Sequence, residues 1–181
     1  MREMLNANSM QLIDCSVEAH APAVLDILNE AILHSTALYE YQLRTPENIR
    51  AWFAEKQAGR FPVIGMEAAG VLLGFATYGT FRARAAYKYT VEHSVYVHKD
   101  HRGRGIGMAL MQELIARARQ QQYHVLVGGI DIANAVSVRM HERLGFNHAG
   151  TIRQSAFKFG RWLDLGFYQL VLETPANPVD G

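Results

Sequence analysis

The stretch HKDHRGRGIGMALMQELIARA, from His98 to Ala118, places a glycine-rich loop in front of an amphipathic helix. Its three glycines alternate with other residues, and two arginines are interleaved with them: Gly103, Gly105, Gly107, Arg102 and Arg104. Glycine loses more conformational entropy on folding than any other residue and has no side chain to pack. The pattern therefore indicates that the loop uses its backbone N–H groups.

An anion is the natural ligand for such a loop. The first N–H groups of a helix have no partner within the helix, and the helix dipole adds partial positive charge there. Glycines allow successive N–H groups to turn toward one phosphate, and arginines add charge-assisted hydrogen bonds. We therefore predict a pyrophosphate-binding loop. The alternative is a tight turn with solvated arginines, but three alternating glycines exceed what a turn needs.

The spacing of the glycines distinguishes between phosphate ligands. A P-loop ends in Gly-Lys-Ser/Thr, whereas this loop continues as Ile106-Gly107-Met108. A dinucleotide fingerprint reads G-x-G-x-x-G, whereas here the third glycine follows after one residue. An alternating glycine loop between a strand and a long helix instead favours coenzyme A.

Length and composition exclude several other classes. The 181 residues suffice for one domain, and a formal net charge of +1 gives no global attraction for nucleic acid. The single cysteine, Cys15, cannot form an internal disulfide and is expected to be a core residue. No apolar run reaches the roughly 18 residues of a membrane span, and no metal-ligand spacing is present. We expect a cytoplasmic protein without a metal.

Apolar periodicity predicts a single α/β domain over 11–173, after a flexible leader, 1–10, and before a loose tail, 174–181. Predicted helices cover 21–35, 46–57, 106–122 and 134–144. Predicted strands cover 11–17, 61–66, 71–81, 89–100, 124–131, 146–154 and 162–172. Thr45-Pro46 is expected to start the second helix and Gly59 to end it, while Glu67–Gly70 is expected to be a hairpin turn.

The loop R102-G-R-G-I-G107 resembles the acetyl-CoA loop of the GCN5-related N-acetyltransferase (GNAT) superfamily. Three further motifs, YTVEHSVYV, SVRMHERLGF and FKFGRWLDLGFYQL, are similar to the branch of phosphinothricin and methionine sulfone/sulfoximine acetyltransferases. The resemblance covers about 11–172. It implies the GNAT fold: a mixed, mostly antiparallel, twisted sheet with a central splay, flanked by helices.

By this resemblance, acetyl-CoA is the co-substrate and lies in the opening of the splay. Backbone groups of Val95, Tyr96 and Val97 are expected to bind the pantetheine arm, which can pair like an extra strand. The expected pyrophosphate residues are Arg102, Gly103, Arg104, Gly105, Ile106, Gly107 and Met108. Asn134 and Ser137 are expected to reach the cofactor from the next helix.

Two residues are candidates for catalysis. The base proposed for the family falls on Glu92, whose carboxylate is suited to taking the proton of the acceptor amine, although a strand glutamate facing solvent is the simpler alternative. His141 shares one helix face with Asn134 and Ser137. Its role stays open between an acid for the leaving thiolate, a substrate-orienting group and a core hydrogen-bonding residue. Tyr96 is an alternative acid.

The acceptor site is expected before and on the same strand. Arg82 and Arg84 alternate along an extended segment, so both guanidinium groups can converge on one carboxylate. The resemblance implies a substrate site made of Arg82, Ala83, Arg84, Glu92, His93 and Ser94. A basic surface loop is the alternative interpretation of the two arginines.

Together these features predict acetylation of the α-amine of a small amino acid or analogue, of the phosphinothricin, methionine sulfone or methionine sulfoximine type. The expected mechanism is direct attack in a ternary complex. Acetylation of a protein N-terminus or a polyamine, and a catalytically silent CoA-binding module, are the alternatives. The resemblance also implies a homodimer, while the net charge and the lack of a long apolar run predict no nucleic-acid or membrane partner.

Overall fold

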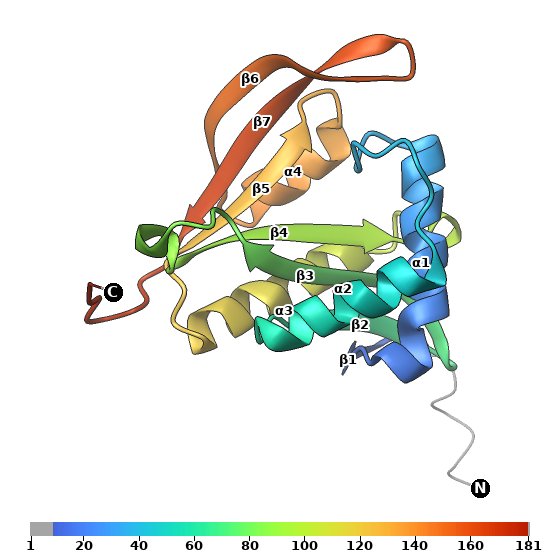
Figure 1. Ribbon diagram of the computed structural model, residues 1–181, viewed down its shortest axis with the longest axis horizontal. Helices are drawn as coiled ribbons and strands as arrows, with labels where there is room; N and C mark the ends of the chain where they lie inside the picture. Colours follow the sequence, from blue (N-terminus) through green and yellow to red (C-terminus); the bar gives the residue numbers. More distant parts are fainter. Residues whose placement is uncertain (1–8, 181) are drawn as a thin grey trace, which may run out of the picture.

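The computed structural model describes residues 9–180, which form a seven-stranded sheet and four α-helices (Figure 1). The elements in chain order are β1 (Gln11–Asp14), α1 (Val17–His34), α2 (Pro46–Ala58), β2 (Val63–Ala68), β3 (Val71–Thr80), β4 (Thr90–Val97), α3 (Ile106–Gln120), β5 (Val125–Asp131), α4 (Ala135–Arg143), β6 (Asn147–Lys158) and β7 (Arg161–Val171). No helix in this part of the chain is both long and apolar enough to cross a membrane.

The sheet has the order β1-β2-β3-β4-β5-β7-β6, and only the pair β4–β5 is parallel. These two strands pair over only a small part of their length, because only Thr90–Glu92 pair with Val125–Val127. Beyond Glu92 the two strands separate, and Figure 1 shows β5, β6 and β7 diverging from β4. The mixed sheet with a central splay is confirmed.

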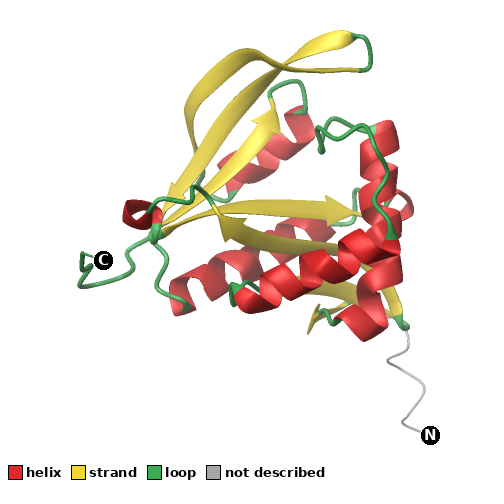
Figure 2. Ribbon diagram, in the orientation of Figure 1, coloured by secondary structure: helices red, strands yellow, loops and turns green. Residues whose placement is uncertain are grey.

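Helices cover both faces of the sheet (Figure 2). On one face α1 and α2 pack on Phe75 and Leu72 of β3, and Val24 and Ile49 are fully buried there. On the other face α3 buries Leu110 and its neighbours against β2–β5, and the apolar side of α4 packs at the edge of the same cluster. Alternate side chains of β4 therefore face different cores: Val91, Val95 and Val97 face the α3 side, and Tyr96 faces the α1–α2 side.

The start of α1 differs from the sequence prediction. The helix begins at Val17 rather than near Pro22, because the Ser16 side chain accepts a hydrogen bond from the N–H of Ala19 and caps it. Pro22 then lies inside the helix, where it removes a single N–H donor. The same cap shortens the predicted first strand, which ends at Asp14.

Both ends of α2 lie where they were predicted, and only the mechanism at the C-terminal end differs. Thr45 and Asn48 form a reciprocal capping box, as Thr45-Pro46 indicated. At the other end Gly59 has an ordinary φ of −78°, and Arg60 takes the left-handed value, +55°. A Cβ on Gly59 would lie 2.4 Å from the Phe61 ring, so close packing is what requires a glycine here.

The sixth strand, β6, extends to Lys158, beyond its predicted end at Gln154, and forms a projecting hairpin with β7 (Figure 1). A register shift between Ile152 and Ala156, with Gln154 at φ +50°, interrupts the apolar alternation that would have revealed the extension. The described part of the tail, 174–180, has no helix or strand. Thr174 donates to the carbonyl of Tyr123, and the N–H of Val179 donates to the Tyr89 hydroxyl. The predicted leader lies mostly outside the described residues.

Candidate active site

Glu92 lies at the point where the splay begins. It forms the last register pair of β4 with β5, opposite Val127. Its carboxylate reaches over β5, because a Cβ built on Gly129 would lie 3.5 Å from Oε1. From His93 to Val97 the edge of β4 that faces β5 has no register partner on that strand, so its peptide groups are open to a ligand. This is the arrangement needed to bind an extended molecule that carries amides.

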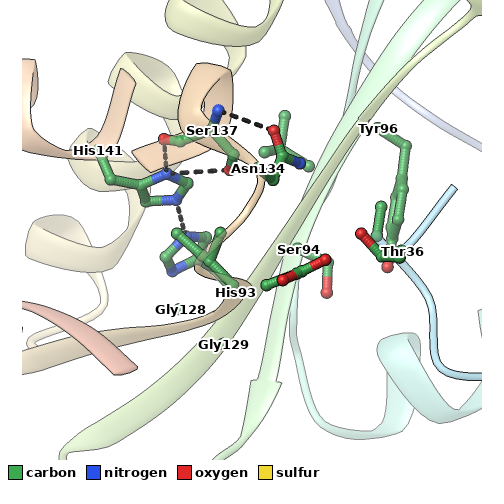
Figure 3. Close-up of a pocket in the computed structure, with 13 residues that line it drawn as sticks. Thr36, His93, Ser94, Tyr96, Gly128, Gly129, Asn134, Ser137 and His141 are labelled. Atoms are coloured by element: carbon green, nitrogen blue, oxygen red, sulfur yellow. Dashed lines mark hydrogen bonds between the residues drawn. The ribbon is translucent and has the colours of Figure 1, made fainter. Parts of the chain in front are cut away.

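A cleft occupies this opening (Figure 3). Its lining consists of Thr36, Ala37, His93, Ser94, Val95, Tyr96, Gly128, Gly129, Ile130, Asp131, Asn134, Ser137 and His141. Seven of these were predicted as site residues: His93, Ser94, Val95, Tyr96, Asn134, Ser137 and His141. The other six were not predicted. Thr36 and Ala37 come from an irregular loop without a motif, whereas 128–131 lie on a predicted buried strand, and the position of Asp131 at its end was the available signal.

The surroundings of Glu92 raise the pKa of its carboxyl group, so that this candidate base holds a proton more strongly than an exposed glutamate does. The side chain is half-buried, and burial raises the pKa of its carboxyl group, while nearby Arg82 opposes this rise. Arg82 and Arg84 are exposed, and no ion pair within the described residues engages either guanidinium. Together with Ala83 they line a second cavity rather than the cleft itself. The predicted acceptor residues are therefore divided: His93 and Ser94 line the cleft, the 82–84 segment lines the second cavity, and Glu92 lines neither.

His141 belongs to a chain of hydrogen bonds on the α4 side of the cleft (Figure 3). Its Nδ1 donates to the carbonyl of Ser137 at 2.7 Å, because a carbonyl can only accept. Its Nε2 then accepts from Nε2 of His93 at 2.8 Å. Both ring nitrogens of His141 are thus occupied by the protein, which leaves neither directed to a leaving group.

The histidine pair is neutral because it is buried. Burial lowers the pKa of both rings, and the neighbouring His141 helps to lower that of His93 to about 3. A Cβ on Gly128 would lie 2.7 Å from the His93 ring, so the glycine makes room for the pair. Nδ1 of His93 has no hydrogen-bond partner. His93 faces α4 and not Glu92, which separates it from the other predicted acceptor residues.

Tyr96 lies on the opposite side of the cleft from His141 (Figure 3). Its ring packs 5.4 Å from that of Phe75, between centroids, and burial raises the pKa of its hydroxyl. The hydroxyl is therefore protonated at neutral pH. Alternation along β4 places Tyr96 on the same face as Glu92 and Ser94.

The glycine loop has the geometry of an anion site. Gly103 and Gly105 have φ values of +76° and +78°. Gly105 is the N-cap residue of α3 and offers no capping side chain, so the first N–H groups of that helix remain available. Gly107 serves another purpose: it lies inside α3, where a Cβ would be 3.2 Å from Sδ of Met140. Met108 follows it in the first turn.

The two loop arginines are already engaged by protein groups. Arg102 pairs with Glu30 at 2.6 Å and donates to the carbonyl of Val97 at 3.2 Å. Arg104 donates to the His101 ring at 3.1 Å. The N–H groups of the loop are therefore the better defined part of the predicted pyrophosphate site. Among residues 9–180 no group of three or more His, Cys, Asp or Glu side chains is arranged to hold a metal ion.

A splayed sheet that leads to an uncapped helix with a glycine loop defines a CoA-dependent acyltransferase as the class of protein. Residues 23–146 match the acetyltransferase (GNAT) family, and the chain belongs to that family. The resemblance drawn from the glycine loop is confirmed.

The branch resemblance is confirmed by individual relatives. The chain is 42% identical over 161 residues to the L-methionine sulfoximine/L-methionine sulfone acetyltransferase of Salmonella typhimurium, covering 89% of this chain and 94% of that protein. It is 38% identical over 162 residues to the phosphinothricin N-acetyltransferase of Streptomyces viridochromogenes, covering 88% and 87%. The structure of yncA from Salmonella typhimurium with its cofactor acetyl-CoA superposes with a TM-score of 0.91 at 40% identity, covering 94% and 98%.

Proposed function

We propose that this protein transfers the acetyl group of acetyl-CoA to the α-amine of a small amino acid or analogue, of the phosphinothricin, methionine sulfone or methionine sulfoximine type. The observation that carries the proposal is the position of Glu92, with its carboxylate at the start of the splay and the unpaired guanidinium of Arg82 nearby. The relatives named for these substrates agree with it.

The splay and the glycine loop fit acetyl-CoA. Peptide groups of Val95 to Val97 face an open edge and would hold the pantetheine arm. The N–H groups that begin α3, from Ile106 onward, would hold the pyrophosphate. At the start of α4, the side-chain Oδ1 of Asn134 caps the helix by accepting from the N–H of Ser137. The side-chain N–H₂ group of Asn134 is then left for the cofactor.

In the proposed reaction Glu92 takes a proton from the acceptor ammonium, directly or through a water. The amine nitrogen then forms a bond to the acetyl carbon, and the carbon–sulfur bond breaks. A backbone N–H near Val95 would stabilise the oxyanion. Tyr96 is the better placed of the two candidate acids for the thiolate, because its hydroxyl is protonated whereas both nitrogens of His141 are occupied.

A covalent acyl-enzyme does not fit Cys15. Burial raises the pKa of its thiol to about 12, with Asp14 and Glu67 adding to the shift. Its Sγ packs against Gly65 of β2, where a Cβ would be 2.7 Å away. A thiol that stays protonated in the N-terminal part of the fold is a poor nucleophile, so direct transfer in a ternary complex is preferred.

The arginine loop favours an amino acid over a polyamine. Arg82 and Arg84 would repel a polycation but can bind a carboxylate. A protein N-terminus as acceptor and a catalytically silent CoA-binding module remain the alternatives, and a homodimer in the cytoplasm remains a prediction.

The proposal is tested by measuring thiol release from acetyl-CoA with methionine sulfone, methionine sulfoximine, phosphinothricin, proteinogenic amino acids, spermidine and a peptide. We expect turnover with the first three, and a KM for these acceptors at least tenfold higher in Arg84→Gln. Turnover with spermidine or the peptide alone would refute the acceptor class. Acetyl-CoA binding without any turnover would favour the silent module.

A further inference from the structure

The β6–β7 hairpin meets the segment between α1 and α2, residues 35–45, through a buried lysine. Lys158 ends β6 and is only 5% exposed, although its neighbours Phe157 and Phe159 are 46% and 56% exposed. Lysine is almost never fully buried unless its ammonium group has partners. The contact therefore needs an explanation beyond the packing of a hairpin tip.

The partners of the Lys158 ammonium group are two backbone carbonyls. Nζ donates to the carbonyl of Ser35 at 2.9 Å and to that of Leu38 at 2.6 Å. These two residues flank Thr36 and Ala37, which line the cleft. Two charge-assisted hydrogen bonds thus fix the chain on both sides of the two cleft residues.

The same two segments are joined a second time. The hydroxyl of Tyr41 donates to the carbonyl of Phe157, one residue before the lysine. Because α1 packs on β3 and β4 while β6 lies beyond β5, these contacts link the two arms of the splayed sheet (Figure 1). Thr36 lies on the side of the cleft that carries Tyr96, away from His141 (Figure 3).

We propose that Lys158 is a positioning residue for the acceptor: its ammonium group holds Thr36 and Ala37 against the cleft, on the strand face that carries Ser94 and Tyr96. It shapes the acceptor site there, because Ser94 is a predicted acceptor residue, and it does so without touching the reacting atoms. This inference rests on the proposed function for its kinetic consequence. Its structural consequence, an ordered 35–41 segment that depends on Lys158, can be measured without any acceptor.

Lys158→Met tests the proposal, because it keeps the aliphatic volume and removes both hydrogen bonds. Lys56→Met is the matched control, since Nζ of Lys56 also donates to a backbone carbonyl, that of Tyr78 at 2.9 Å, outside the cleft. For Lys158→Met we expect an acceptor KM about tenfold higher, an acetyl-CoA KM within twofold of wild type, and faster amide hydrogen exchange over 35–41. Lys56→Met changes none of these three quantities.

Two further variants keep the test decisive. Tyr41→Phe removes only the second contact and is expected to move exchange over 35–41 in the same direction by a smaller amount, even if Lys158→Met folds poorly. Lys158→Arg retains donors and is expected to recover most of the acceptor KM. Unchanged exchange over 35–41 in both Lys158→Met and Tyr41→Phe would overturn the proposal. If wild type acetylates no amino acid but the exchange difference persists, the proposed function fails and the positioning role of Lys158 stands.

Discussion

At the scale of single residues, the site depends on groups whose protonation is set by burial. Glu92 is half-buried at the start of the splay, so its carboxyl group has a raised pKa. A base with a raised pKa holds a proton more strongly and is better matched to an amine near neutral pH. His93 and His141 show the reverse, because burial keeps both rings neutral.

Glu92→Gln removes the base while keeping the shape and a hydrogen-bonding side chain. We expect kcat to fall about a hundredfold or more, the usual contribution of a general base, while the acetyl-CoA KM changes less than threefold. The measurement is steady-state kinetics from pH 5 to 9. A variant with wild-type turnover across this range would refute the assignment of Glu92 as the base.

The same profile tests the influence of Arg82. In wild type, kcat/KM falls as the pH drops through the raised pKa of Glu92, because protonation removes the base. Arg82 opposes the rise in pKa, so Arg82→Gln moves this acidic limb to higher pH. Arg84→Gln is the control, since Arg84 is not among the groups that act on Glu92. Equal shifts in the two variants would contradict a specific effect of Arg82.

The buried histidine pair predicts a pH dependence of stability. Below its ordinary pKa of 6.5 the unfolded chain binds a proton at residue 93, whereas the folded chain binds none until about pH 3. The unfolding free energy therefore falls as the pH drops, by about 2 kcal/mol for this group at pH 5. We expect His93→Gln, which retains a donor toward His141, to lose less stability than wild type between pH 7 and 5.

Urea unfolding at the two pH values measures this difference. The exposed His34 provides the control, and His34→Gln is expected to follow the wild-type loss. An equal loss in wild type and His93→Gln would show that residue 93 takes up no extra proton on unfolding, and would argue against a neutral buried pair.

At the scale of elements, the glycine loop is the feature that sequence alone identified best. Alternating glycines followed by helical periodicity specified the N-terminus of α3, and the left-handed φ of Gly103 and Gly105 accounts for two of them. Gly107 satisfied the same pattern for a different reason, its approach to Met140 on α4. A sequence motif therefore identifies only which type of residue occurs at a position, whereas the reason that Gly107 is a glycine lies in the packing of α3 against α4.

Other parts of the site leave no periodic or motif signal. Thr36 and Ala37 come from an irregular segment whose placement depends on Lys158, more than 100 residues away along the chain. The family resemblance assigned His93 to the acceptor site, whereas strand alternation turns its ring toward α4. Contacts between remote segments cannot be inferred from local spacing, so Thr36 and Ala37 were missed.

Gly105→Ala tests the role of the loop backbone. The Cβ meets nothing within 4 Å, so the cost is the left-handed conformation alone, about 1 kcal/mol. Gly70→Ala in the β2–β3 turn is matched, with φ +75° and equally open space. We expect similar falls in stability for both, but an acetyl-CoA Kd about tenfold higher only for Gly105→Ala, measured by calorimetry. Equal Kd values would exclude the loop from the cofactor site.

At the scale of the whole molecule, the fold is two arms joined by a short parallel seam. Three register pairs connect β4 to β5, and the contacts of Lys158 and Tyr41 connect the arms again beside the cleft. The opening between the arms leaves the facing edges of β4 and β5 without partners. An unpaired strand edge favours pairing with another extended chain. A ligand that pairs with both edges would complete the sheet and stabilise the relation between the arms.

Acetyl-CoA is therefore expected to act as a bridging ligand. At a hundred times its Kd it stabilises the fold by about 2.7 kcal/mol, which a rise in Tm reports. In native hydrogen exchange at short times we expect new protection at 94–97 of β4 and 128–131 of β5, where the strands have separated. Amides of β1 and β2 serve as the internal control, because those strands lie at the far end of the sheet from the β4–β5 opening. Protection confined to the start of α3 would mean that the phosphates bind while the splay stays empty, and the bridging role of acetyl-CoA would be wrong.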